Sequence, residues 1–174
     1  MTLPYAEPLV RRDPQPRVIP EPPRIGEPGG DPCGLCDWLA GAKQSENGPP
    51  LWQNDDWALI RATGITIPGI VWLTSREHHD SFADLPDHLA AGYGPVVARV
   101  ERAILGLGGI GRVHVYRWGD GLSHFHVWFY PRPLGMLEAR RHMLPLWAEL
   151  LPAASEEAVA DAERKIAAAM AAGD

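Results

Sequence analysis

The most informative segment of the chain is His124-Phe125-His126-Val127-Trp128-Phe129-Tyr130-Pro131-Arg132. It is rich in aromatic and β-branched residues and closes on a proline, a composition that predicts a strand. Because side chains alternate along a strand, His124, His126 and Trp128 are expected on one face, roughly 6–7 Å between neighbours. One imidazole of such a pair can be held by a metal or a hydrogen bond while the other attacks a substrate. Histidines on a half-buried strand also serve as plain packing residues, so this segment alone leaves both interpretations open.

The second informative segment is Cys33-Gly34-Leu35-Cys36, which holds both cysteines of the chain. Two residues between the thiolates let both sulfurs reach one ion, and Gly34 permits the tight turn. We find no signal-peptide pattern and no apolar stretch that could span a membrane, which predicts a cytoplasmic protein. A structural disulfide is disfavoured in that compartment. A redox pair would follow a strand, whereas a proline-rich stretch precedes Cys33, so metal binding is favoured over redox exchange.

A tetrahedral zinc shell needs two further ligands. The segment 69–73 is predicted to be a strand and 74–79 the turn beyond it, so a histidine of this turn and one of the 124–132 strand can meet the cysteines. Such a site joins three distant parts of the chain, and a structural zinc contributes on the order of 10 kcal/mol to folding. The candidate ligands are all the histidines of the chain: His78, His79, His88, His114, His124, His126 and His142.

Together these motifs resemble the histidine-triad superfamily. The signature of that family is three histidines alternating with apolar residues, followed by two more apolar residues and often Pro-Arg, and the segment 124–132 matches it except at the third histidine. Residues 68–73, with Arg76, His78 and 81–85 after them, are similar to the family's central strand and following loop. The cysteine pair matches the amino-terminal zinc pair of many members. The resemblance covers about residues 31–133.

By position, the resemblance implies a structural zinc bound by Cys33, Cys36, His78 and His124, with His79 as an alternative to His78. The second signature histidine, which is the family's nucleophile, falls on His126. Neutral His126 would attack phosphorus and form a phosphohistidine-type intermediate that water or another acceptor resolves.

Three residues are candidates for substrate binding. Arg132 is expected to stabilise the phosphoryl charge together with backbone amides. Ser123, beside the signature, is a candidate, as is Asp120, for serving a leaving group or orienting His124, and a role in the turn is the alternative for both. Trp128 stands where the family has its third histidine, and an indole offers only one N–H on a bulky ring.

The chain departs from the family pattern at two further places. The segment 60–64 lacks the carboxylate that in the family often meets ribose hydroxyls, and the segment 117–123 lacks the usual asparagine and Gly-Gln-Ser/Thr stretch that cradle phosphate. Most of the seven tryptophans, including Trp52, Trp57, Trp72 and Trp147, are expected in the core.

Length and charge bound the remaining choices. The 174 residues suffice for one sizeable core, and the net charge of −6 without a Lys/Arg run argues against nucleic-acid binding. Three segments are predicted: a disordered proline-rich tail (1–30), a zinc-stapled domain (31–133) and a C-terminal helical extension (134–174). The predicted class is α+β, with a bent antiparallel sheet of about five strands and helices on one side.

The predicted elements follow from hydrophobic periodicity. Strands are expected at 57–61 and 69–73, and a hairpin at 112–118 and 123–130. Helices are expected at 85–105, with a kink or interruption near Ala91 caused by Gly94-Pro95, and at 136–151 and 155–171. The last helix has a thin apolar stripe that could pack on a partner or lie on the surface.

The preferred function is a hydrolase or transferase acting on a phosphoester or phosphoanhydride of a small anionic substrate such as a nucleotide. One alternative is a noncatalytic zinc-stabilised binding protein on the same fold. Another is an enzyme of divergent chemistry in specialised metabolism, which would need an open metal position that a Cys-Cys-His-His shell lacks. Family members commonly pair through the helix and strand before the signature, so a homodimer is expected.

Overall fold

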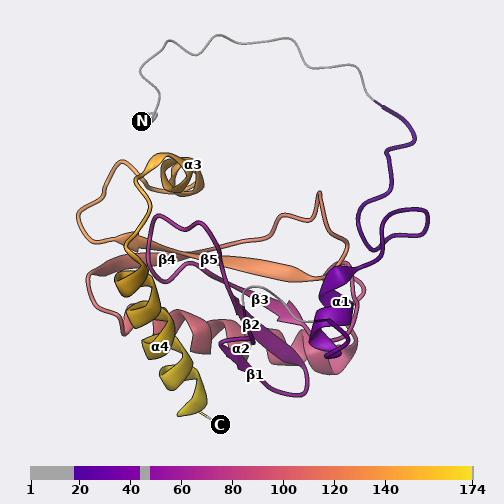
Figure 1. Ribbon diagram of the computed structural model, residues 1–174, viewed down its shortest axis with the longest axis horizontal. Helices are drawn as coiled ribbons and strands as arrows, with labels where there is room; N and C mark the ends of the chain where they lie inside the picture. The colour runs from indigo at the N-terminus through magenta and orange to yellow at the C-terminus, as the bar shows by residue number, and fades with distance from the viewer. Residues whose placement is uncertain (1–17, 44–47, 174) are drawn as a thin grey trace.

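The computed structural model describes residues 18–43 and 48–173, and its centre is a five-stranded sheet (Figure 1). The spatial order is β1-β2-β3-β5-β4, and each neighbouring pair is antiparallel. The strands are β1 Trp52–Gln53, β2 Trp57–Arg61, β3 Val71–Ser75, β4 Ile110–Tyr116 and β5 His126–Pro133.

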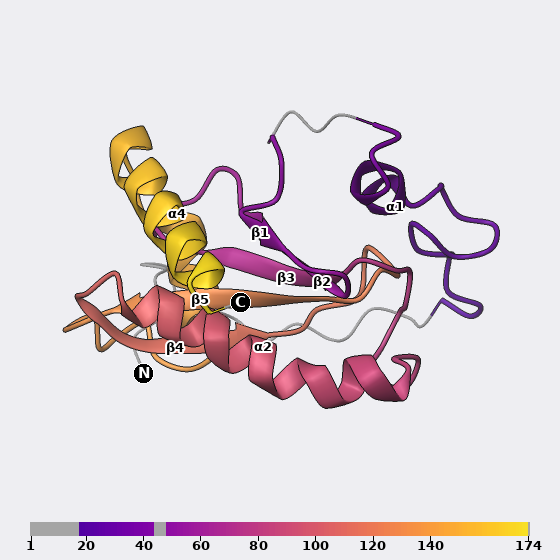
Figure 2. The same cartoon turned by 90° about the horizontal axis from the view of Figure 1, so that it is seen from below.

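Four helices accompany the sheet in the described part of the chain: α1 Gly34–Leu39, α2 Asp87–Leu105, α3 Met143–Leu150 and α4 Glu156–Ala171. Figures 1 and 2 show α2 running along one face of the sheet, with α4 crossing near its end. The short helix α1 lies at the other end, where the chain enters β5. The predicted α+β class with a sheet of about five strands is confirmed.

The alternation along β5 divides the molecule into two apolar clusters. Val127 and Phe129 are fully buried and pack with the apolar residues of α2 and α4, such as Val100 and Ile166. The intervening aromatic residues face the opposite side of the sheet, where a smaller cluster includes Leu144 of α3. One face of β5 therefore builds the main core, while the other carries partly buried aromatic residues.

The structure corrects three predicted elements. Helix α2 is one unbroken helix, because Ala91 and Pro95 lie on its exposed side, where water can bond the carbonyl that Pro95 leaves without a donor. Helix α3 begins at Met143 instead of 136, since Gly135 and Arg141 have φ values of 86° and 59° in the left-handed region. Strand β5 begins at His126, so His124 lies just before it.

Both ends of the described chain contact the rest of the fold. Helix α4, within the predicted C-terminal helical extension, contributes Ile166 and Met170 to the main core. Residues 24–30, within the predicted tail, form turns and hydrogen bonds with the segment before β5. Residues 1–17 of that predicted tail lie outside the described residues.

Strand β4 is an edge strand, and its Val115 is 40% exposed. This geometry is compatible with the expected homodimer, which stays a prediction. Within residues 18–43 and 48–173, no helix has the length and apolar character needed to cross a membrane.

Candidate metal centre and aromatic hollow

Four side chains from three separate parts of the chain meet at the end of the sheet beside α1. Cys33 caps the N-terminus of α1 and Cys36 lies in its first turn, while His78 follows β3 and His124 precedes β5. Their potential ligand atoms all lie within 4.8 Å of one another. Among the histidines of the described residues, the structure thus selects His78 rather than His79 for this group.

The spacing of these atoms fits a tetrahedral metal shell. The distance from Sγ of Cys36 is 3.2 Å to Nδ1 of His78 and 3.3 Å to Nδ1 of His124, and Sγ of Cys33 lies 3.4 Å from the latter atom. Tetrahedral Zn–S and Zn–N bonds of about 2.3 and 2.0 Å place sulfur and nitrogen roughly 3.5 Å apart. Two sulfurs and two imidazole nitrogens are also the donor set typical of structural zinc.

Hydrogen bonds orient both imidazoles toward the sulfurs. Nε2–H of His124 donates to the Ser75 carbonyl at 2.9 Å, which leaves the lone pair on Nδ1. The hydroxyl of Ser123 donates to the Ile25 carbonyl at 3.1 Å and can accept from Nε2–H of His78 at 3.4 Å. The same tautomer is thereby favoured in both rings.

The electrostatics of the group call for a cation. Burial, together with the neighbouring Cys33, raises the pKa of Cys36 to about 12, so a positive charge nearby is needed to favour the Cys36 thiolate. Burial lowers the pKa of His124 to about 4, which keeps this ring neutral and able to bind metal. These four residues therefore fit a metal ion, which they would hold as a closed shell without an open position.

A second feature lies on the open face of β5: a hollow of about 460 Å³, which we call the aromatic hollow. Trp72 of β3 and Trp128 of β5 are direct cross-strand neighbours whose rings stack with centroids 5.9 Å apart. Trp118, on the loop between β4 and β5, lines the hollow and is 40% exposed. The other main lining residues are Ile25, Asp120 and His126.

His126 is fixed by its backbone and by an aromatic neighbour. Its Nδ1 lies 2.7 Å from the His124 carbonyl, so a neutral ring donates from Nδ1 and keeps its lone pair on Nε2. The ring meets Trp72 edge-on, with centroids 5.9 Å apart. A histidine prepared in this way, in a hollow that can admit a ligand, can act as a nucleophile or a hydrogen-bond acceptor.

The structure does not bring all predicted substrate-binding residues to the hollow. Arg132 lies six residues beyond His126 on β5, about 20 Å along the strand. It is buried there, and its guanidinium donates to the carbonyls of Pro133 and Met136. Ser123 is also buried and belongs to the metal centre, as described above. Only Trp128 of the three lines the hollow.

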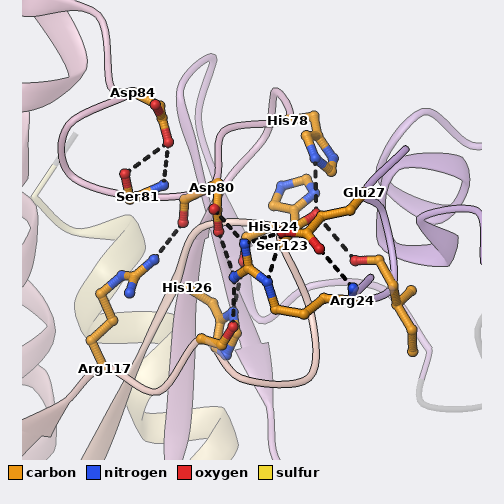
Figure 3. A network of polar contacts seen from close by, with 12 residues as sticks. Arg24, Glu27, His78, Asp80, Ser81, Asp84, Arg117, Ser123, His124 and His126 are labelled. Atoms are coloured by element: carbon orange, nitrogen blue, oxygen red, sulfur yellow. Dashed lines mark hydrogen bonds and ion pairs between the residues drawn. The ribbon is translucent and has the colours of Figure 1, made fainter. Parts of the chain in front are cut away.

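Sequence reasoning missed the N-terminal strap, by which we mean residues 24–27 (Figure 3). Arg24 makes a bidentate ion pair with Asp80 and also bonds Glu27 and the Gly119 carbonyl. Hydrogen bonding to Arg24 lowers the pKa values of both carboxyl groups. The strap thus connects the loop after β3 to the loop before β5. No local sequence pattern predicts these contacts, because Arg24 and its partners in the two loops are far apart in the sequence.

The middle of the strap connects the two features. The backbone N–H of Ile25 donates to Gly121 O at 3.2 Å, and the N–H of Ser123 donates to Ile25 O at 2.9 Å. The side chain of Ile25 lines the aromatic hollow, whereas its carbonyl also accepts from the Ser123 hydroxyl next to His78. The strap therefore forms one wall of the hollow and supports a histidine of the metal centre.

The fold is shared with solved histidine-triad structures. A Zn-bound histidine triad family protein from Mycobacterium smegmatis superimposes with a TM-score of 0.59 at 19% identity, covering 82% of this chain and 95% of that one. A hypothetical histidine triad nucleotide-binding protein from Sulfolobus tokodaii gives 0.58 at 13% identity, with coverages of 80% and 93%. No family model matches the sequence, and no curated protein matches it significantly.

A third structure agrees with these two. A Hit-like protein involved in cell-cycle regulation from Bartonella henselae gives a TM-score of 0.56 at 14% identity, covering 76% of this chain and 92% of that one. The chain therefore has the histidine-triad fold, as its signature segment predicts.

Proposed function

We propose that this protein is a zinc-stabilised hydrolase or transferase that acts on a phosphoester or phosphoanhydride through His126. The observation that supports this most is the 2.7 Å contact between Nδ1 of His126 and the His124 carbonyl. With Nδ1 donating there, the lone pair on Nε2 stays available for attack, and the ring lines the hollow. The same backbone segment carries a metal-centre histidine at residue 124, so a metal would fix the position of the nucleophile without entering the reaction.

In the proposed reaction, the Nε2 lone pair of His126 forms a bond to phosphorus as the bond from phosphorus to the leaving oxygen breaks. The leaving oxygen takes a proton from solvent. Water or a second alcohol then attacks phosphorus and releases its proton to solvent, while the P–N bond breaks and its electron pair returns to Nε2. The group transferred is thus held on the ring until the acceptor arrives.

Zinc is the metal we propose for the four-residue group. The Cys-Cys-His-His donor set and the 3.2–3.4 Å sulfur–nitrogen spacings support it. When bound, the ion supplies structural cross-linking of α1, the loop after β3 and the entry to β5. Because its four ligands complete the shell, we assign it no contact with substrate.

The test is turnover of a panel of phosphodiesters, nucleoside phosphoramidates and dinucleoside polyphosphates by the wild type and His126→Ala. We expect the variant to lose at least about 10²–10⁴-fold in rate with zinc content and unfolding unchanged, because His126 is not a metal ligand here. His88→Ala, which removes an exposed histidine of α2, is the matched control and should retain full activity. A phosphorylated His126 found by mass spectrometry would support the proposal directly.

The second candidate function is a noncatalytic binding protein on the same scaffold. Within the described residues, the lining of the hollow includes no lysine or arginine, the side chains that usually neutralise phosphoryl charge. If the wild type binds small molecules in the hollow but His126→Ala matches it in every turnover assay, the binding protein is the correct description. Turnover by Trp128→His, which restores an imidazole at this position, would then test whether the missing histidine alone accounts for the lack of activity.

A further inference from the structure

We propose that the aromatic hollow selects an organic cation, so that the non-reacting part of the ligand carries a quaternary or tertiary ammonium group. The proposal concerns the same hollow as the proposed function, but it does not require His126 to react. If both hold, the substrate class is a phosphoester of an ammonium-bearing alcohol.

Three indole side chains line the hollow. Trp72 and Trp128 stack across neighbouring strands with an interplanar angle of 27°, which gives an aromatic wall on the open side of the sheet. Trp118 approaches from the loop and is held by Tyr116, which stacks on it with centroids 5.1 Å apart. Indole is the ring to which cations bind best, by attraction to the negative face of the π-system.

The charge of the hollow also suits a cation. Asp120 is its carboxylate, and in the described part of the chain its lining has neither lysine nor arginine. The two arginines of the adjoining loops are occupied: Arg24 pairs with Asp80 and Glu27, and Arg117 bonds the Asp80 carbonyl. An anion would therefore be repelled by the solvent-exposed carboxylate of Asp120, whereas an ammonium group would meet an opposite charge.

Beyond Asp120 the surface stays acidic. A neighbouring hollow shares Asp120 with it and is also lined by Glu21 and Glu27, with Arg24 as its one cation among the described residues. Because Arg24 is engaged by two carboxylates, the net local charge is negative. The volume of about 460 Å³ lies in the range of small-molecule sites, which fits an ammonium alcohol and its phosphoester.

The experiment compares choline with 3,3-dimethylbutan-1-ol, a neutral compound of the same shape, by titration calorimetry and tryptophan fluorescence on the full zinc-loaded chain. We expect choline to bind at least tenfold more tightly. Asp120→Asn should reduce choline affinity about five- to tenfold and leave the neutral alcohol unaffected, while Trp118→Ala should weaken choline at least fivefold. Asp55→Asn, which removes an exposed carboxylate between β1 and β2, is the matched control and should change nothing.

Three results would overturn the inference. Equal affinity for choline and the neutral alcohol would mean an apolar hollow without charge selection. Inorganic phosphate binding more tightly than choline would mean an anion site. An unchanged choline affinity in Asp120→Asn would place the cation elsewhere.

Turnover separates this inference from the proposed function. Choline binding with no hydrolysis of phosphocholine or of any phosphodiester supports the cation site and contradicts the hydrolase. Hydrolysis of uncharged esters at least as fast as of their choline counterparts contradicts the cation site and leaves the hydrolase standing.

Discussion

Substitution of Gly26 by alanine tests whether the N-terminal strap supports the metal centre. Gly26 has a φ of +92°, and a Cβ at this position would lie 2.6 Å from Ser123 Oγ and 2.9 Å from His78 Cε1. Gly29 has a similar φ of +87°, but its Cβ would meet nothing closer than Pro23 Cγ at 3.9 Å. Both alanines thus carry the same backbone strain, and only Gly26→Ala adds a collision.

The expected magnitudes follow from these contacts. A left-handed backbone costs a non-glycine residue about 1–2 kcal/mol, which is the whole effect expected for Gly29→Ala. To relieve the collision in Gly26→Ala, the strap must move and give up the Ile25–Gly121 and Ser123–Ile25 backbone bonds. Each such bond is worth about 0.5–1.5 kcal/mol, so the additional loss is about 1–3 kcal/mol.

Hydrogen exchange at the amides of Ile25 and Ser123 is the direct assay, because both protons lie in the lost bonds. Gly29→Ala should lower their protection about 5- to 30-fold. Gly26→Ala should lower it by a further factor of about 5 to 150, since every 1.4 kcal/mol is tenfold. It should also weaken zinc binding about 10- to 100-fold, because Ser123 orients His78.

Equal protection in the two variants would show that the strap does not rest against Ser123 and His78. Loss of protection with an unchanged zinc affinity would refute the orienting role of Ser123, while leaving the strap in place.

Two further predictions address the metal and the pH dependence of stability. Cys33→Ser should abolish the stoichiometric zinc found by metal analysis and lower Tm by about 2–4 °C for each kcal/mol of stability lost. A chelator should have the same effect on the wild type. A metal-free protein that is equally stable would contradict a structural zinc. Burial, aided by the charge of Arg132, lowers the pKa of His114 in the folded protein below its usual 6.5. The neutral His114 ring therefore contributes fully to the free energy of unfolding above pH 6.5, and this contribution is lost as the pH falls through the lowered pKa. Urea unfolding at pH 7.5 and 5.5 should therefore show the wild type losing more stability on acidification than His114→Gln, and parallel losses would refute this assignment.

The local pattern of the sequence was sufficient for the sheet and for part of the site. Alternating apolar residues around His126 specify a strand with one buried face, and that face is the main core in the structure. The spacing of Cys33 and Cys36 places two sulfurs at the start of one helix. At this spacing both sulfurs can bind the same ion. The kink predicted from Gly94-Pro95 was wrong, because the local effect of a proline on a helix does not reveal which side of that helix faces water.

What the sequence by itself determined is therefore local: the signature strand, the cysteine pair and the class of fold follow from periodicity and spacing within short segments. Only the tertiary structure selected His78 over its neighbour and brought Trp72 and Trp118 together with Ile25 of the strap. The physical reason is that strand register and loop paths, set by packing of the whole core, decide which distant side chains meet.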